Sequence, residues 1–257
     1  MHEIFLGVMG GMIAAIATTA GAVPALVGRK MSQATSDTML GFAAGVMLSA
    51  SYFSLILPGI DVAEEQFGSV WIAAAVASVG IASGAGFVAW LNRAIPHEHF
   101  KTGPEGGADG ATVARIWLFV FAISIHNFPE GLSIGVAFGV DKSNGLSVMT
   151  GISLQDIPEG LAVAVALVGL GYSRRKALFY TALTGLVEPV GALLGVVAVS
   201  VSAALLPWGL TFAAGAMLYI ISHEIVPETH RNGHQHRATL GFIVGLILMM
   251  FLDVTLG

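Results

Sequence analysis

Residues 126–131 (His-Asn-Phe-Pro-Glu-Gly) and residues 155–160 (Gln-Asp-Ile-Pro-Glu-Gly) are two copies of one pattern. In each copy two polar residues and one apolar residue precede Pro-Glu-Gly. Each copy lies near the middle of a long apolar run. An ionised side chain at the centre of a membrane helix costs about 2.5–3.5 kcal/mol on insertion scales. The acids of both copies therefore need compensation, and the sequence must be searched for its source.

The composition predicts a polytopic membrane protein. The chain has 257 residues, of which 55% are hydrophobic and 11% are charged, and its mean hydropathy is +0.82. Soluble domains carry about 25% charged residues. There is no cysteine, which excludes disulfides, thiolate metal sites and cysteine nucleophiles. We expect a lipid bilayer as the environment and no nucleic-acid partner.

Eight apolar segments are long enough to cross a membrane, since a span needs roughly 20 apolar residues. The first segment is too long for the apolar part of a signal peptide and lacks its basic flank, so it is interpreted as a span. The expected fold is all-α, a single transmembrane domain over residues 1–257. Its predicted spans are 4–27, 38–57, 69–91, 113–139, 145–170, 177–202, 208–227 and 238–256.

The basic residues predict the orientation. Ten of the eleven Lys and Arg residues fall in loops on one side of the predicted bundle, and Lys142 is the exception. Loops rich in Lys and Arg face the cytoplasm. Both termini are therefore expected outside, and the expected location is a plasma membrane, most simply a bacterial inner membrane.

A distant repeat suggests internal symmetry. Residues 42–48 (Phe-Ala-Ala-Gly-Val-Met-Leu) match residues 212–218 (Phe-Ala-Ala-Gly-Ala-Met-Leu), and the two predicted spans run in opposite directions. An inverted repeat of spans 1–3 against spans 6–8 is typical of transporters. A chance likeness between two helices rich in small residues is the alternative interpretation.

Four carboxylates fall near mid-span: Glu130, Asp156, Glu159 and Glu188. No Lys or Arg lies deep in any predicted span, so an ion pair within the chain cannot offset them. Protons, water or bound cations must compensate these charges. A purely structural role for all four acids is the weaker interpretation.

Helical spacing places the polar residues of each copy on one face. His126 precedes Glu130 by four positions, and Gln155 precedes Glu159 by four, so each pair shares a face. Pro129 and Pro158 would free backbone carbonyls of the preceding turn. Carboxylates, an imidazole and amides without thiolates suit a metal such as zinc, and several carboxylates permit a two-metal site. Calcium would not need the histidine.

At these residues the chain resembles the ZIP (ZRT/IRT-like) divalent-metal transporters, in their bacterial GufA-like branch. The resemblance covers essentially the whole chain. It is carried by the two Pro-Glu-Gly motifs, by Glu188-Pro189 and by residues 222–228 (Ser-His-Glu-Ile-Val-Pro-Glu). It implies eight helices in a 3+2+3 arrangement and a metal site formed by the fourth, fifth and sixth helices. It also implies that helices 1, 4, 5 and 6 move against helices 2, 3, 7 and 8.

The resemblance further implies a binuclear site with Glu130 and Glu159 as bridging ligands. His126 and Met47 would complete one metal, and the other would be held by Asn127, Gln155, Asp156 and Glu188. From its sequence context alone, Met47 is equally a packing residue of a helix rich in small residues. Many family members have a histidine at the position of Gln155, and an amide is a weaker zinc ligand. Cadmium, iron and manganese therefore stay open as cargo beside zinc.

Other polar residues are candidates for the two ends of a pathway. Asp61 and Asp253 lie near the outer face and would attract cations at an entrance. Three residues near the inner end of the seventh span would form an exit: His223, Glu224 and Glu228. They could equally be interfacial residues that reach water. The loop histidines 97, 99, 230, 234 and 236 either hold a leaving metal or have no function.

These observations favour a transporter over an enzyme. We expect uptake of a divalent metal ion, zinc first, into the cytoplasm by alternating access, with no catalytic residue and no catalytic cofactor. A proton-coupled carrier of a small organic solute is one alternative. An intramembrane metallohydrolase is a weaker one, because His223-Glu224 lacks the second histidine of a His-Glu-x-x-His motif. Whether the protein forms a homodimer stays open.

Overall fold

Helices make up nearly all of the described chain. The structure is a computed structural model, and it describes residues 2–27, 32–94, 98–99, 103–104, 127–169 and 172–256. The only strands in these ranges have two residues each, β1 (Glu98–His99) and β2 (Gly103–Pro104), and they pair antiparallel. The prediction of an all-helical membrane protein is therefore confirmed.

The first half of the chain forms three long helical stretches. They consist of α1 (His2–Ala22) with the short 3-10 helix η1 (Val23–Val27), then α2 (Gln33–Ser49), the π-helix η2 (Ala50–Ile56) and α3 (Leu57–Phe67) in succession, and then α4 (Val70–Ala94).

The second half begins, within the described residues, with a helical segment over residues 127–140. It is followed by α6 (Lys142–Gly169), α7 (Arg174–Gly185), α8 (Val187–Val201), η3 (Ala203–Leu205), α9 (Leu206–Ile220), the π-helix η4 (Ile221–Ile225), α10 (Val226–Thr229) and α11 (Gln235–Leu256).

Six helical stretches of the described chain are long and apolar enough to cross a membrane. They correspond to the first, second, third, sixth, seventh and eighth predicted spans: His2–Leu26, Gln33–Phe67, Val70–Arg93, Arg174–Val201, Leu206–Thr229 and Gln235–Thr255. The fifth predicted span corresponds to α6, which has 28 residues but is not among the six. The predicted fourth span, 113–139, lies partly outside the described residues.

The second helical stretch is longer than predicted. The predicted span ended at residue 57 and a loop was expected to follow, but the helix continues to Phe67, so the acidic residues 61, 64 and 65 are helical. Pro58 does not end the helix, and it lies at the start of α3, directly after the π-helix η2. The helix ends at Gly68, whose φ of 66° suits a residue without a Cβ.

The sixth predicted span, 177–202, is broken rather than continuous. Helix α7 ends at Gly185, and α8 begins at Val187. Pro189 has no N–H to donate to the carbonyl four residues earlier, that of Gly185, so the helix is interrupted there. As a result Glu188 lies in the first turn of α8, next to the positive end of the helix dipole.

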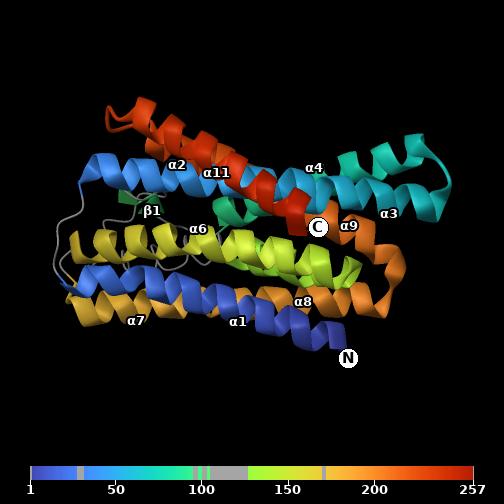
Figure 1. The fold of residues 1–257 in the computed structure, drawn as a ribbon, viewed down its shortest axis with the longest axis horizontal. Coiled ribbons are helices and arrows are strands. Elements are labelled where there is room, and N and C mark those ends of the chain that lie inside the picture. Colours follow the sequence, from blue (N-terminus) through green and yellow to red (C-terminus); the bar gives the residue numbers. More distant parts are fainter. Residues whose placement is uncertain are drawn as a thin grey trace.

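The helices pack as two groups (Figure 1). The α1 group consists of α1, the 127–140 segment, α6, α7 and α8, and the α2 group consists of α2 to α4 and α9 to α11 with their π-helices. Between the groups, α6 contacts both α2 and α11, and the 127–140 segment contacts α9. Both chain ends lie at the same end of the bundle (Figure 1).

Glycines bring helix backbones together inside each group. In the α2 group, a Cβ on Gly45 of α2 would lie 2.0 Å from the carbonyl oxygen of Phe242 in α11, and one on Gly245 would lie 2.1 Å from that of Phe42. Small residues permit such close crossings in lipid. Among the described glycines, every one that meets a carbonyl oxygen of another long helix does so within its own group.

The crossing of α2 and α11 occurs a second time between α9 and α4. Gly215 of α9 faces the Ile81 carbonyl, and the Phe212 carbonyl faces Gly84 of α4. Gly215 and Phe212 hold the same places in the repeated heptapeptide as Gly45 and Phe42. Each heptapeptide is followed by a π-helix and then by a proline.

The α1 group shows the same doubling. Gly131 faces the carbonyl oxygen of Glu188, and Gly160 faces that of Thr18, with a Cβ–O distance of 2.1 Å and 2.0 Å, respectively. Gly131 and Gly160 end the two Pro-Glu-Gly motifs. The two motifs are therefore seated in equivalent ways, one against α8 and one against α1.

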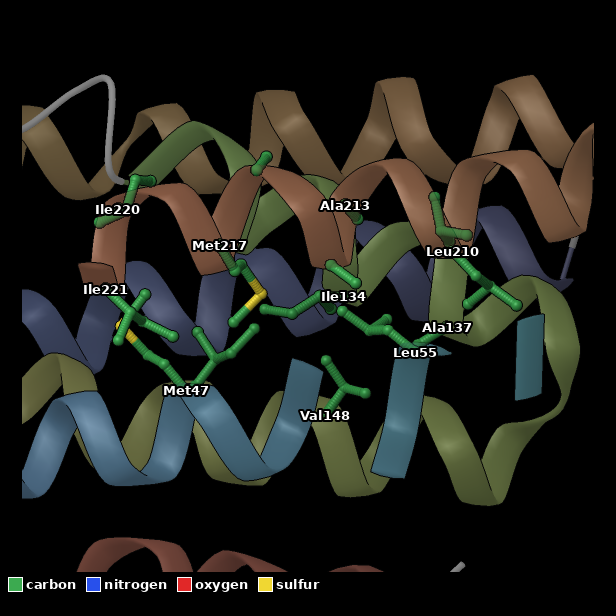
Figure 2. Close-up of a cluster of buried hydrophobic side chains, with 14 of the residues drawn as sticks. Met47, Leu55, Ile134, Ala137, Val148, Leu210, Ala213, Met217, Ile220 and Ile221 are labelled. Carbon is green, nitrogen blue, oxygen red and sulfur yellow. The ribbon is translucent and has the colours of Figure 1, made fainter. Parts of the chain in front are cut away.

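Fully buried apolar side chains from both groups fill the space between them (Figure 2). The cluster joins the α1 group and the α2 group through Met47, Leu55, Ile134, Ala137, Val148, Leu210, Ala213, Met217, Ile220 and Ile221. We call this set the apolar plug. Burial of its side chains contributes to holding the two groups in their present relation.

Candidate metal centre

Three carboxylates meet where the two Pro-Glu-Gly motifs face each other. One oxygen each of Glu130, Asp156 and Glu159 lies within 4.8 Å of the others, and all three residues are buried. Glu130 belongs to the 127–140 segment, and the other two lie three positions apart on α6. The prediction that the two motifs present their acids to one site is consistent with this geometry.

Gln155 joins two of these carboxylates. Its Nε2 donates hydrogen bonds to Glu130 Oε1 at 2.6 Å and to Asp156 Oδ1 at 2.9 Å. Hydrogen bonds to ionised acceptors are stronger than those between neutral groups. The amide of Gln155 therefore fixes the orientation of both carboxylates and holds its own Oε1 in the same buried space.

Glu188 is held in a similar way from two other helices. Its Oε1 accepts hydrogen bonds from Asn127 Nδ2 at 2.9 Å and from Thr18 Oγ1 at 2.8 Å. The break between α7 and α8 places this carboxylate beside the 127–140 segment and α1. Asn127 and Thr18 thus connect the fourth carboxylate to the rest of the site.

Each of five side chains in this site has one buried oxygen with no hydrogen-bond donor in the described part of the chain. These oxygens are Asn127 Oδ1, Glu130 Oε2, Gln155 Oε1, Asp156 Oδ2 and Glu188 Oε2. All five are acceptors, and in Glu130, Asp156 and Glu188 the other carboxylate oxygen is hydrogen-bonded. A buried acceptor without a donor is costly. Hydrogen bonds link these side chains in two groups, Glu130 with Gln155 and Asp156, and Asn127 with Glu188, and carboxylate and amide oxygens are the kind of ligand that a hard cation takes.

The charges favour the same conclusion. Two carboxylates about 5 Å apart repel each other by about 3 kcal/mol at an effective dielectric constant near 20. The hydrogen bonds that reach Glu130, Asp156 and Glu188 come from amide and hydroxyl groups, which carry no formal charge. Bound cations remove this repulsion and use the unpaired oxygens at the same time.

Two predicted ligands stand apart from this set. His126 lies outside the described residues. Met47 is fully buried in the apolar plug, where its neighbour Met217 accepts a hydrogen bond from Ser133 Oγ at 3.1 Å (Figure 2). Ser133 lies three positions after Glu130, so Met217 lies near the carboxylates.

The two predicted entrance residues line one cavity. Asp61 of α3 and Asp253 of α11 border a space of about 590 Å³, which we call the outer cavity. Glu65 and Asp141 line it as well, and so does Asn144. Ala137 and Ile134 of the apolar plug lie between the outer cavity and the carboxylates, because they lead along the 127–140 segment from Val140 at the cavity to Glu130.

The predicted exit residues lie at the opposite end of the seventh span. His223 and Glu224 belong to the π-helix η4, and the His223 ring stacks on Tyr219 with a centroid distance of 4.9 Å. Glu228 forms an ion pair with Arg231 at 3.5 Å. These residues are separate from the buried carboxylates.

The loop histidines differ from one another. His234 Nδ1 lies 2.9 Å from Oδ2 of the fully buried Asp37, and the carboxyl group of Asp37 also accepts a hydrogen bond from Asn232. His230 Nδ1 contacts the Val226 carbonyl at 2.9 Å, and His236 is exposed. The side chains of His97 and His99 lie outside the described residues.

Sequence reasoning missed several residues of these sites. Thr18 is one polar residue in a run of small ones, and nothing local indicates that it meets Glu188, 170 positions later. Asp37 lies one position before the second predicted span, which begins at residue 38, and Glu65 lies between the second and third predicted spans. Asp141 and Ser147 fell near the predicted boundary at 139–145. Asp37 is the first acidic residue of the second helix, and this position could have identified it as a candidate.

Comparison with known proteins places this geometry in a family. A sequence model described as "ZIP Zinc transporter" matches residues 96–253. The chain is 44% identical to "Zinc transporter GufA" of Myxococcus xanthus, covering 98% of this chain and 99% of that protein. It is 49% identical to "Zinc transporter ZIPB" of Bordetella bronchiseptica, covering 97% of this chain and 81% of that protein. It is also 32% identical to human "Zinc transporter ZIP11" over 99% of this chain and 98% of that protein. The chain therefore belongs to the ZIP family, in its bacterial GufA-like branch.

Proposed function

We propose that the protein carries divalent metal ions, zinc first, across a membrane into the cytoplasm through the buried carboxylate site. The observation that carries this proposal is the convergence of five unpaired buried oxygens, three of them from carboxylates. The relatives' names, all zinc transporters, support the choice of cargo. Cadmium, iron and manganese are the further cargo ions to be compared, because Gln155 supplies an amide rather than an imidazole.

The proposed site holds two metals. Glu130 and Glu159 bridge them, His126 and Met47 complete one, and the other is bound by Asn127, Gln155, Asp156 and Glu188. The grouping of three carboxylates within 4.8 Å supports a shared set of ligands. Met47 is buried in the same cluster as Met217, which contacts Ser133 three positions after Glu130, and this burial is compatible with a thioether ligand.

The proposed topology has eight spans in a 3+2+3 arrangement, with both termini outside in a bacterial inner membrane. Both termini lie at the same end of the bundle, and this placement supports an even number of spans (Figure 1). The doubled helix crossings support an inverted repeat, because equivalent glycines and carbonyls meet in both. Helices of such repeats move as bodies in transporters.

The proposed cycle moves the α1 group against the α2 group. Cations collect in the outer cavity at Asp61 and Asp253, pass the apolar plug when the groups separate on that side, and reach the carboxylates. They leave along His223, Glu224 and Glu228 when the opposite side opens. The plug supports the assignment of the present arrangement as closed toward the outer cavity, because its side chains are fully buried.

Zinc entry into liposomes that contain a zinc-sensitive dye tests the proposal. Glu130→Gln and Glu159→Gln keep the size of the side chain and remove one charge each, so zinc entry should fall to the level of empty liposomes. Glu64→Gln is the matched control, because Glu64 is exposed on α3 and lies outside the carboxylate site. Normal entry in both site variants, or no entry in the unchanged protein for any divalent ion, would refute metal transport through this site.

A further inference from the structure

The outer end of α6 makes two hydrogen bonds to the α2 group. Ser147 Oγ donates to Asp253 Oδ1 of α11 at 2.6 Å, and Asn144 Nδ2 donates to the Ser54 carbonyl of η2 at 3.1 Å. Asn144 and Ser147 lie three positions apart, so they share one face of α6. The α1 group is thus connected to the α2 group by two polar contacts beside the outer cavity.

The two acceptors, Asp253 Oδ1 and the Ser54 carbonyl, lie close together in the α2 group. The Ser54 carbonyl belongs to the π-helix η2, and Pro58, four positions later, has no N–H to donate to it. The side chain of Ser54 donates to Asp253 Oδ1, the same oxygen that accepts from Ser147. Asp253 is therefore held from η2 within its own group and from α6 across the boundary between the groups.

The first turn of α6 is itself fixed. Asp141 Oδ1 accepts hydrogen bonds from the backbone N–H groups of Ser143 at 2.7 Å and Asn144 at 2.9 Å, which caps the helix. Ser147 is 1% exposed, so its hydroxyl group has few other partners available. The donors are thus presented to the α2 group by a rigid helix end.

We propose that Ser147 and Asn144 form a latch, a pair of hydrogen bonds that keeps the outer side of the transporter closed. The hydrogen bond from Ser147 to Asp253 is the more important of the two. This inference rests on the proposed function. The latch joins the two groups directly above the apolar plug, so separation of the groups on this side must break both hydrogen bonds. Asp253 also lines the outer cavity. An entering cation that binds Asp253 competes with the Ser147 hydroxyl, and this differential affinity favours the open arrangement.

The accessibility of the apolar plug tests the latch. The chain has no cysteine, so a single Ala137→Cys substitution places one thiol in the plug without further changes. Intact cells that express this variant are treated with a membrane-impermeant thiol reagent, and the rate of labelling is measured. Because a hydrogen bond to a charged group is removed, Ser147→Ala in this background should raise the labelling rate about tenfold. Asn144→Ala should raise it as well.

Two further variants separate the latch from a general loosening of α6. Ser147→Thr retains a hydroxyl group and should label at the rate of the parent. Thr150→Ala removes a hydroxyl that donates to the Leu146 carbonyl of its own helix, and it should also leave the rate unchanged. An unchanged rate in both Ser147→Ala and Asn144→Ala, or an equal increase in Thr150→Ala, would overturn the proposal.

The labelling needs no transported metal, so its result is independent of the liposome measurement. Faster labelling in Ser147→Ala together with absent zinc entry would retain a gate but refute the proposed cargo. Zinc entry that depends on Glu130 together with unchanged labelling would retain the proposed function and refute the latch.

Discussion

Replacing Gly131 by alanine should damage the metal centre through the backbone rather than through a ligand. A Cβ at this position would lie 2.1 Å from the carbonyl oxygen of Glu188 and 2.7 Å from its Cα. Both are backbone atoms, so no side-chain rotation relieves the clash. The 127–140 segment and α8 must move apart by about 1 Å to restore an ordinary contact.

The same movement acts on the site itself. The hydrogen bond from Asn127 to Glu188 measures 2.9 Å, and an added 1 Å or so places the atoms beyond hydrogen-bond distance. Overpacking of this kind costs about 1–3 kcal/mol in stability, and loss of a hydrogen bond to a charged acceptor costs about 1.5–3 kcal/mol. We expect a lower melting temperature by about 5 °C and a zinc affinity weaker by about tenfold.

The measurements are a thermal melt in detergent and a zinc-binding titration, with zinc entry into liposomes as the functional readout, for Gly131→Ala and for Gly86→Ala. Gly86 is the matched control, because it also lies inside a long helix, yet a Cβ there would meet nothing within 4 Å. Gly86→Ala should leave both quantities unchanged. If Gly131→Ala melts and transports like the unchanged protein, the close crossing does not hold the site in place.

Three further outcomes follow from named contacts. Thr18→Val removes the hydroxyl that donates to Glu188 and should weaken zinc binding by about tenfold in a titration, whereas Thr19→Val, whose hydroxyl donates to Ala15 in its own helix, should not. Asp37→Asn removes the charge that faces His234, and it should lower the melting temperature by several degrees while zinc entry retains its dependence on Glu130. Zinc at about 100 times its dissociation constant should stabilise the metal-free protein by about 2.7 kcal/mol, as measured by a melt before and after chelation. Glu130→Gln should abolish this stabilisation, and an equal gain in that variant would place the bound zinc elsewhere.

Much of the site was predictable because its residues repeat locally. The spacing within each Pro-Glu-Gly motif places Asp156 and Glu159 on one face of α6, and the structure brings both to Glu130. The absence of deep basic residues indicated that protons, water or bound cations compensate the acids. These inferences depend on spacing and composition, which the sequence displays directly.

The remaining features depend on packing between distant segments. Thr18 belongs to the site because α1 packs against Gly160 of α6 and because its hydroxyl group reaches Glu188 in the first turn of α8. Hydropathy could not reveal the break before Val187, because the residues around it are as apolar as those of a continuous helix. The extension of α3 to Phe67 was missed because acidic residues on a helix end were interpreted as a loop.

The α2 group pairs the second helix of the chain with the last one, and this pairing has a consequence for biosynthesis. Gly41 and Gly45 of α2 are made early, but the carbonyls that they face belong to α11, the last helix of the chain. At about 5–20 residues per second, ribosomes need about 10–40 s to add the intervening residues, roughly 200 in number. During that interval α2 must reside in the bilayer with its glycine face against lipid or an insertion factor, and α4 must do so until α9 supplies the Phe212 carbonyl that faces Gly84. A product that terminates before α11 never acquires this partner, and membrane quality-control proteases should remove it although all of the proposed metal ligands are present.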